Sequence, residues 1–282
     1  MNQELIKRLR EKESKMIEIR RYLHEHPELS FHETETPQYI ADFYKEKDCD
    51  VETNVGPNGV KVTIDSGKPG KTIAIRADFD ALPIEEQTGL SFASKNKGVM
   101  HACGHDAHTA YMLILGETLI EMKEQFKGKV VIIHQPAEEI PPGGAQGMIK
   151  DGVLEGVYHV LGAHVMSTME AGKVFYKEGY VQTGRAYFKL VVQGKGGHGS
   201  SPHMANDAIV AGSNFVTIAQ TVVSRRLNPF ETGVVTIGSF DGKGQFNVIK
   251  DTITIEGDVR ALTDDTRDNI QNEMTRLVRG LE

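Results

Sequence analysis

The sequence lacks several features that would each assign it to a class of protein. It has only two cysteines, Cys49 and Cys103, so no disulfide framework can hold the fold. No apolar run approaches the roughly 20 residues of a membrane span. The net charge is −7 and Lys and Arg form no long block, which argues against a nucleic-acid partner. The charged N-terminal segment resembles no signal peptide, so we expect a cytoplasmic protein without nucleic-acid or membrane partners.

The chain is long enough, at 282 residues, for two domains and an ample hydrophobic core. A bound metal would therefore serve chemistry rather than folding. Up to about residue 182, apolar periodicity predicts alternating helices and strands, which favours an α/β sheet with helices on both faces. The predicted helices are 3–26, 36–47, 107–121 and 145–151, and the predicted strands are 60–64, 72–75, 130–134 and 157–163.

The pattern changes in the second part of the chain, residues 183–282. It predicts strands at 187–192, 234–240 and 252–259 and helices at 206–223 and 264–281. Residues 252–256 alternate strictly between polar and apolar, which indicates a sheet with one solvated face and helices on the other. This β-α-β-β-α order is a ferredoxin-like α+β unit without its last strand, so we expect the chain to stop inside a domain.

A short run of metal-binding side chains extends from His101 to His108. If the segment is extended, Cys103 and His105 point the same way, and Gly104 leaves room between them. By itself this run fits a metal site and a buried cysteine beside a helix-capping His-Asp pair equally well.

Other candidate ligands and acids follow predicted strands. Glu138 and Glu139 follow a strand that Pro136 ends, so that one carboxylate can bind metal while the other transfers protons. His164 ends an apolar strand, and Asp78 and Asp80 follow another. Each has a simpler explanation as a solvated acid, a core histidine or a turn residue. Their shared position at strand ends favours one site, because open α/β folds place their sites there.

Together these segments resemble the amidohydrolase branch of the aminoacylase and carboxypeptidase-G type metallopeptidases. That branch includes hippurate hydrolases, auxin-conjugate hydrolases and N-acetyl-diaminopimelate deacetylases. The resemblance implies a zinc-peptidase-like catalytic domain at 1–182 and an inserted ferredoxin-like lid and dimerisation domain at 183–282. It rests on residues 21–30, 76–89, 100–108, 135–139 and 194–203.

The resemblance also implies a role for each candidate residue. The ligands of two divalent metal ions would be Cys103, His105, Glu139 and His164. Zinc or manganese would suit this mixed donor set, with nickel or cobalt as alternatives. Glu138 would be the general base, and Asp78 and Asp80 would be supporting residues rather than ligands.

In the smaller domain the resemblance makes His198 a stabiliser of the oxyanion, in this family often across the interface of a homodimer. Asn247 and Arg260 would bind the substrate, with Arg260 on its carboxylate. The simpler alternatives are a plain glycine-rich turn around His198 and a surface salt bridge at Arg260.

The expected function is hydrolysis of the amide bond of N-acyl amino acids, small-molecule substrates, by water that the metals activate. Members of the family continue beyond this segment and supply a further histidine ligand. A truncated homologue that acts as a dimerisation or regulatory module is therefore one alternative. The other is a cysteine hydrolase that uses Cys103 with His105 or His108.

Overall fold

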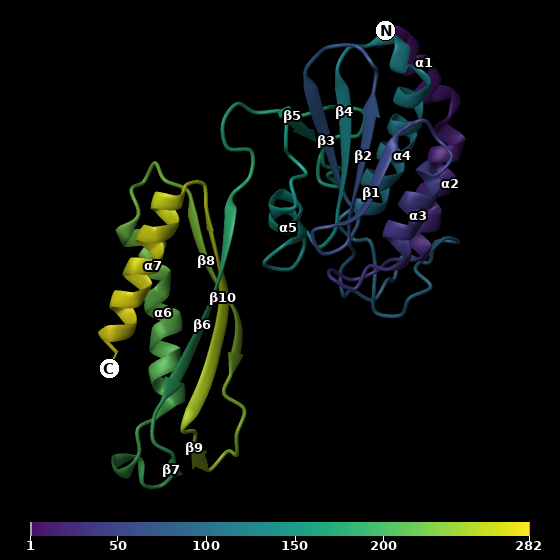
Figure 1. Cartoon of the computed structure of the whole chain (residues 1–282). Coiled ribbons are helices and arrows are strands. Elements are labelled where there is room, and N and C mark those ends of the chain that lie inside the picture. Colours follow the sequence, from purple (N-terminus) through teal and green to yellow (C-terminus); the bar gives the residue numbers. More distant parts are fainter. Residues whose placement is uncertain (1, 282) are drawn as a thin grey trace. The chain divides into compact units, whose positions relative to one another are not determined.

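The chain divides into two compact units, Met1–Ala171 and Gly172–Glu282. The computed structural model describes residues 2 to 281, and Figure 1 shows their helices and strands. Each unit is described by itself. The domain boundary predicted at residues 182 and 183 lies eleven residues beyond the division between the units, just before strand β6.

Unit 1 is built on a mixed five-stranded sheet of order β1-β2-β4-β3-β5. Its strands are β1 (Asp50–Val55), β2 (Gly59–Asp65), β3 (Thr72–Asp78), β4 (Lys129–Gln135) and β5 (Val157–Gly162). β3 is parallel to both of its neighbours, whereas β2 is antiparallel to β1 and β4. Because β3, β4 and β5 run in one direction, their carboxyl ends lie at the same edge of the sheet. That edge carries the candidate site.

Helices cover both faces of this sheet, as predicted (Figure 1). One face packs against α3 (Glu35–Tyr44) and α4 (His105–Glu121), with α1 (Asn2–Glu11) and α2 (Glu13–Glu25) packed on α4, and the other face carries α5 (Gly144–Lys150). Val62 and Ile132 point into the first core together with Leu113 of α4, while Val131 and Ile133 pack with Met148 of α5. This two-sided burial explains why the β4 sequence is apolar throughout rather than alternating.

The single helix predicted from residue 3 to 26 is wrong, because α1 and α2 are separate helices that meet at Lys12. Lys12 has φ −100° and ψ 7°, outside the helical region, and its ammonium group binds Glu117 and Glu121 of α4. The apolar periodicity continues through this break, so the sequence pattern alone could not reveal it.

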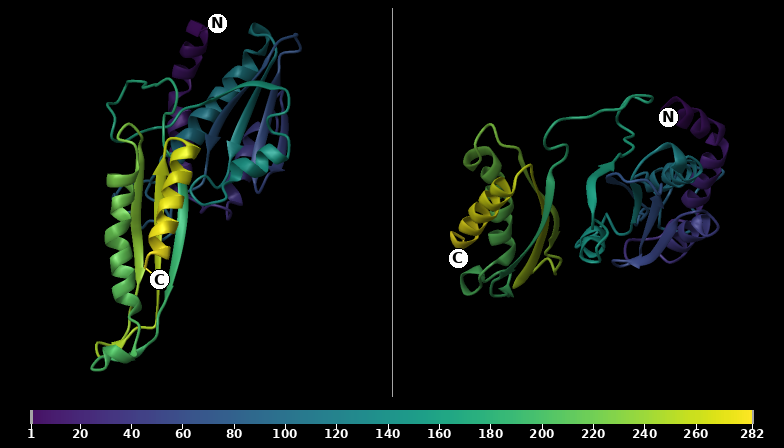
Figure 2. Two further views of the ribbon diagram at one scale, coloured as in Figure 1. Left: turned by 90° about the vertical axis from the view of Figure 1, so that its left-hand side faces the viewer. Right: turned by 45° about the horizontal axis from the view of Figure 1, so that its top comes forward.

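Unit 2 contains an antiparallel sheet of order β6-β10-β8, formed by β6 (Gly184–Gln193), β8 (Gly233–Asp241) and β10 (Thr252–Ala261). The long helices α6 (Ala208–Arg226) and α7 (Asp264–Arg279) lie side by side on one of its faces (Figure 2). Asp207 and Thr263 cap these helices by accepting backbone N–H groups of the first turn. The order of these main elements is the predicted β-α-β-β-α.

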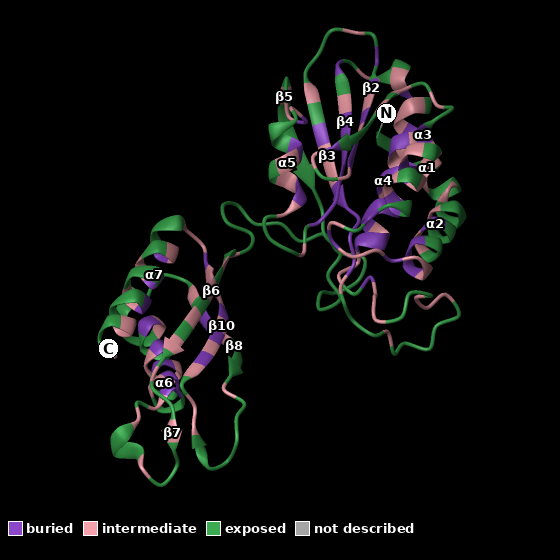
Figure 3. Ribbon diagram, turned by 60° about the horizontal axis from the view of Figure 1, so that its bottom comes forward, coloured by how far each residue is buried: buried purple, intermediate pink, exposed green. Residues whose placement is uncertain are grey.

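The two faces of β10 differ in burial, as its alternating sequence predicts. Ile253, Ile255 and Val259 are buried beneath the helices, whereas Thr254 and Glu256 are only half-buried on the opposite face (Figure 3). At one end of the unit, β7 (Gly197–His198) pairs with β9 (Val248–Ile249) beside the short helix η2 (Pro202–Met204). Across residues 2 to 281, no helix is long and apolar enough to cross a membrane.

Candidate metal centre

Cys103 and His105 lie on either side of a sharp turn, not in the extended segment that the sequence suggested. Gly104 has φ +90°, and α4 begins immediately after it. A Cβ atom at position 104 would lie 2.4 Å from Cγ2 of Val165, so only glycine fits this turn. The turn nevertheless directs both side chains to the same place, because His105 occupies the first position of the helix.

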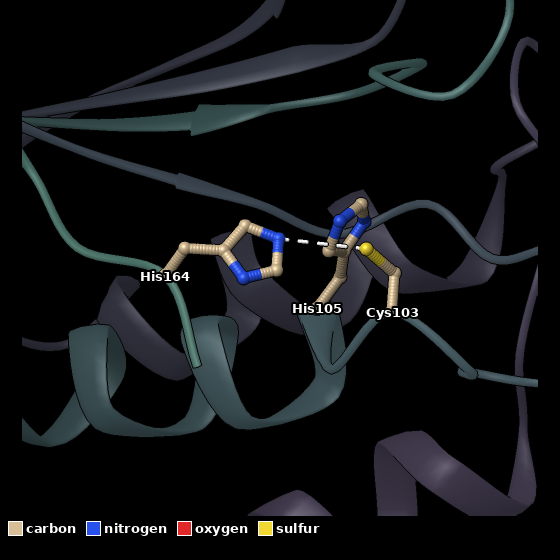
Figure 4. Close-up of side chains that lie close together, drawn as sticks. All are labelled: Cys103, His105 and His164. Carbon is tan, nitrogen blue, oxygen red and sulfur yellow. Dashed lines mark hydrogen bonds between the residues drawn. The ribbon is translucent and has the colours of Figure 1, made fainter. Parts of the chain in front are cut away.

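Three predicted ligands meet at this turn. One donor atom each from Cys103, His105 and His164 lies within 4.8 Å of the other two (Figure 4). The Cys103 Sγ atom is 3.4 Å from Nε2 of His164, which belongs to the segment that follows β5. The structure therefore brings together a sulfur and two nitrogen donors from distant parts of the sequence.

Backbone carbonyl groups orient the two imidazole rings. Nδ1 of His105 is 2.8 Å from the Asp80 carbonyl oxygen, and Nδ1 of His164 is 2.6 Å from the Val165 carbonyl oxygen. A carbonyl oxygen only accepts, so Nδ1 must donate its proton in both rings. In each neutral ring Nε2 then carries the free lone pair, which is the arrangement that metal-binding histidines use.

A cation suits the buried atoms around His105. Its Nε2 atom and Oε1 of Glu139 are both buried without a hydrogen-bond partner among the described residues, and they lie 4.0 Å apart. Such unsatisfied atoms are uncommon in folded proteins and are typical of ion-binding and functional sites. The donors present therefore fit a divalent metal ion held by His105 and Glu139.

The charge of the surroundings agrees with this assignment. Burial alone would lower the pKa of His105, but the hydrogen bond to Asp80 and the neighbouring Cys103 and Asp78 raise it to about 11. Without a metal, the site thus retains a proton on His105. A metal ion would displace that proton and take over its positive charge.

Asp80 connects two of the predicted ligands. Its Oδ1 atom is 3.2 Å from Nδ1 of His105, while Oδ2 accepts hydrogen bonds from the Ser30 hydroxyl at 2.7 Å and from the backbone N–H of Glu139 at 3.0 Å. Burial opposes ionisation, yet these bonds lower the pKa of Asp80. This geometry agrees with the supporting role predicted for Asp80.

Asp78 ends β3 and is also surrounded by partners. Its Oδ1 atom is 2.6 Å from Nδ1 of His108, and Oδ2 forms an ion pair with Arg76 at 2.6 Å. Oδ2 is also 3.6 Å from Nε2 of His105. One donor atom each from Asp78, His105 and His108 also lies within 4.8 Å of the other two, so the predicted supporting role of Asp78 stays a prediction.

Glu138 and Glu139 converge on His105, as the sequence suggested they could after Pro136. One carboxylate oxygen from each lies with a nitrogen of His105 in a group whose members are within 4.8 Å of one another. Burial, followed by the charges of Glu139 and Asp78, raises the pKa of Glu138. A raised pKa suits a carboxylate that takes up and releases protons near neutral pH.

The sequence reasoning missed how His164 is held. Nε2 of His108 accepts the backbone N–H of Val165 at 3.0 Å, and the Tyr111 hydroxyl donates to the Ala163 carbonyl oxygen at 2.8 Å. As a base for Cys103, His108 would need a free ring nitrogen, but Asp78 and Val165 occupy both of its nitrogens. Its spacing of three residues from His105 on one helix was the available signal, because such residues share a face.

A second buried network joins the start of α4 to α2. Oδ2 of Asp106 contacts Nδ1 of His24 at 2.8 Å and Nε of Arg20 at 2.7 Å, while Nε2 of His24 is 3.3 Å from Glu86. His24, Glu86 and Asp106 belong to the motif segments, and Arg20 directly precedes one of them. The network anchors the first turn of α4, where His105 lies.

The residues predicted to contact substrate are in unit 2. His198 pairs with Val248 across β7 and β9, and the Gly199 N–H donates to the Asn247 carbonyl oxygen at 2.8 Å, so His198 and Asn247 are neighbours. Arg260 is eight residues along β10 from Thr252, which is about 26 Å at the usual rise per residue. Its guanidinium contacts Asp258 at 2.6 Å. The structure thus separates Arg260 from the other two residues.

An open α/β sheet with nitrogen, oxygen and sulfur donors at the ends of parallel strands defines an α/β protein with a metal-binding centre. The chain belongs to peptidase family M20/M25/M40, whose profile matches residues 74–261. This membership confirms the predicted hydrolase family and the α/β fold.

Named relatives support the amidohydrolase branch. The chain is 39% identical over 282 residues to the N-acyl-L-amino acid amidohydrolase of Geobacillus stearothermophilus, covering 100% of this chain and 76% of that protein. It is 42% identical over 259 residues to an N-acetyl-L-cysteine deacetylase of Bacillus subtilis (strain 168), covering 92% of this chain and 62% of the relative.

A solved structure extends the comparison to the metal centre. The Bacillus subtilis protein YXEP, described as a dinuclear metal-binding peptidase of the M20 family, superposes with a TM-score of 0.77 at 36% identity. The match covers 95% of this chain and 69% of that one. The predicted metal-binding character is therefore shared with a structural relative.

Proposed function

We propose that this protein is a metal-dependent amidohydrolase that cleaves the amide bond of N-acyl amino acids. The observation that carries the proposal is the pair of unsatisfied buried atoms, His105 Nε2 and Glu139 Oε1, beside Cys103 and His164. Glu138 lies next to this donor set with a raised pKa. A hydrolytic site needs these two parts, a ligand set and a separate base.

Cys103, His105, Glu139 and His164 would hold two divalent ions, zinc or manganese, with nickel or cobalt as alternatives. The dinuclear relative supports the number of ions. Bound ions would supply Lewis acidity that activates water and polarises the acyl carbonyl. Cys103 would then serve as a thiolate ligand and not as a nucleophile.

Glu138 would transfer the proton in both halves of the reaction. It takes a proton from the attacking water and delivers it to the departing amide nitrogen, so that a free amino acid leaves. The raised pKa makes Glu138 a stronger base toward the attacking water and brings its pKa closer to neutral pH, where the same group can also return the proton. Asp80 keeps His105 and Glu139 in place meanwhile, through the contacts described above.

The names of the relatives support the proposed substrate class. Two of them are named for N-acetyl amino acids, N-acetyl-L-cysteine and N-acetyldiaminopimelate, and another for N-acyl-L-amino acids. In the smaller domain, His198 and Asn247 would face the scissile amide and Arg260 the substrate carboxylate. Because Arg260 and His198 lie far apart in one chain, this assignment requires two copies of the chain to contribute to each site, and a homodimer is therefore part of the proposal.

The cytoplasmic location belongs to the same proposal. Both cysteines, Cys49 and Cys103, are free thiols. A thiolate ligand such as Cys103 persists best in a reducing compartment.

Glu138→Gln tests the base directly. The variant should retain its metal ions, measured by elemental analysis, but lose about 10²- to 10⁴-fold in hydrolysis of N-acetyl amino acids. Glu155→Gln, at an exposed position outside the site, serves as the matched control. Unchanged turnover in Glu138→Gln would refute the assignment.

Two further treatments separate the alternative functions. Activity that survives a chelator but not iodoacetamide would indicate a cysteine hydrolase that uses Cys103. A purified wild-type protein with no metal above trace level would instead favour a dimerisation or regulatory module.

A further inference from the structure

The turn that carries Glu138 and Glu139 contains an unusual backbone conformation. Ala137, the residue before them, has φ +49° although it is not glycine. A residue with a Cβ atom disfavours this left-handed region and stays in it only where its surroundings hold it there. Ala137 is fully buried, so those surroundings are protein groups.

Two hydrogen bonds hold the Ala137 backbone. Its N–H donates to Oε1 of Glu33 at 2.8 Å, and its carbonyl oxygen accepts the N–H of Gly144 at 2.9 Å. The Gly144 bond is local, but Glu33 lies 104 residues earlier, in the loop before α3. Glu33 is therefore the tertiary contact that fixes this turn.

The environment of Glu33 is costly for a carboxylate. The residue is 1% exposed, and its second oxygen, Oε2, has no hydrogen-bond partner within residues 2 to 281. No ion pair to a lysine, arginine or histidine is found for it in the described part of the chain. Burial raises the pKa of Glu33, so a charged carboxylate is unfavourable here, and its long-range hydrogen bond to Ala137 points to a role at that turn.

We infer that Glu33 is a positioning residue that holds Ala137 in its left-handed conformation and thereby directs the segment that carries Glu138 and Glu139 toward His105. If Ala137 relaxed to an extended conformation, the chain would leave β4 in a different direction, and the segment that carries both carboxylates would turn away from His105. This inference rests on the proposed function, because it assumes that both carboxylates act at one site.

The same loop also holds the other end of the turn. The Ser30 hydroxyl donates to Oδ2 of Asp80, and that oxygen accepts the Glu139 N–H. Ser30 thus acts on Glu139, which follows Glu138, through Asp80. Glu33 acts on Ala137, which precedes Glu138, through a direct hydrogen bond. A loop that contributes no ligand itself determines the direction of the two carboxylates.

Two conservative variants distinguish the effect of the Glu33 side-chain length from the effect of its charge. Glu33→Gln retains an oxygen at the same distance but loses the charge. Glu33→Asp retains the charge, but its side chain is one methylene shorter and cannot reach the Ala137 N–H. Glu18→Asp, at an exposed position on α2, is the matched control for shortening a glutamate.

Amide hydrogen exchange of the peptide 135–140 provides a readout that does not depend on activity. In Glu33→Asp the Ala137 amide should exchange about 10- to 100-fold faster, whereas Glu33→Gln and Glu18→Asp should resemble the wild type. Metal retention against a chelator should fall about 10- to 100-fold in Glu33→Asp alone. The opposite ranking, with Glu33→Gln impaired and Glu33→Asp normal, would overturn the inference.

A second change tests the mechanism. Glycine adopts φ +49° without a penalty, so Ala137→Gly added to Glu33→Asp should recover most of the lost metal retention. If Glu33→Asp fails to fold, the double variant must fold under the same conditions for the inference to stand. Absence of rescue would mean that Glu33 acts elsewhere. A wild-type protein that binds no metal would refute the proposed function. The order of Ala137 amide exchange rates among the Glu33 variants would still test whether Glu33 holds the turn.

Discussion

His134 is the residue whose replacement should stabilise this protein most clearly. It lies near the end of β4, is 0% exposed, and neither ring nitrogen has a hydrogen-bond partner in the described residues. The centroid of its ring is 5.9 Å from that of the Tyr44 ring. On the neighbouring strand β2, Val60 is the residue that pairs with His134. Phenylalanine has a ring of similar shape without polar atoms, so His134→Phe should suit this apolar site better.

The expected gain follows from two opposing effects. Each buried polar atom without a partner costs about 1 to 3 kcal/mol, and the neutral His134 ring has two such atoms. The larger phenyl ring adds some crowding, which costs about 1 kcal/mol or more in a packed core. We therefore expect His134→Phe to raise the free energy of unfolding by about 1 to 2 kcal/mol at pH 7.5.

The gain should increase as the pH falls. Burial lowers the pKa of His134 from 6.5 to about 3. Below pH 6.5 the unfolded chain binds a proton at this residue that the folded protein does not bind, so the wild type loses about 1.4 kcal/mol per pH unit. The variant lacks this loss, and its advantage should grow by about 2 kcal/mol between pH 6.5 and pH 5.

Urea unfolding followed by circular dichroism at pH 7.5, 6.5 and 5 measures this difference. His159→Gln, at an exposed position on β5, is the control and should show no such pH-dependent difference from the wild type. A His134→Phe protein that is less stable than the wild type would contradict the packing reasoning. A difference that stays constant with pH would contradict the linkage to a buried neutral imidazole.

Two further predictions concern carboxylates. Asp80→Ala should weaken metal binding about 10- to 100-fold in a chelator competition, because Asp80 orients both His105 and Glu139; equal affinity would refute this. Glu28→Gln should lower the free energy of unfolding by about 1 kcal/mol at pH 7, because the Glu28 carboxylate accepts three backbone N–H groups at the start of α3. Burial opposes ionisation, but these bonds lower the pKa of Glu28 below 4.5, so the difference should disappear as the pH falls through that folded-state value.

Much of the fold could be predicted because its signals are local. Polar and apolar residues alternate in β10 because helices cover only one face of its sheet. The apolar run of β4 is continuous because helices cover both faces of its sheet. The N-terminal helix was predicted as one element, since periodicity does not register a single non-helical residue at Lys12. Strand β1 was not predicted, because most of its residues are exposed and it has little apolar pattern.

The candidate site was predictable in its residue types but not in its orientation. Cys103 and His105 could be picked out because they flank a glycine, and Glu139 and His164 because they follow predicted strands. Nothing in the sequence showed that His108 holds the segment of His164, because that bond joins residues 57 positions apart. The separation of Arg260 from His198 likewise depends on strand pairing in the folded unit.

The sequence by itself determined the chemical composition of the site and the order of the secondary structure, because residue type and periodicity are properties of short segments. Only the tertiary structure decided which atoms can bind a metal. The carbonyl oxygens of Asp80 and Val165 leave Nε2 free on two histidines, and Glu33 holds the turn before the glutamate pair. Most of these contacts join segments far apart in the chain, and they become possible only when the sheet brings the strand ends to one edge.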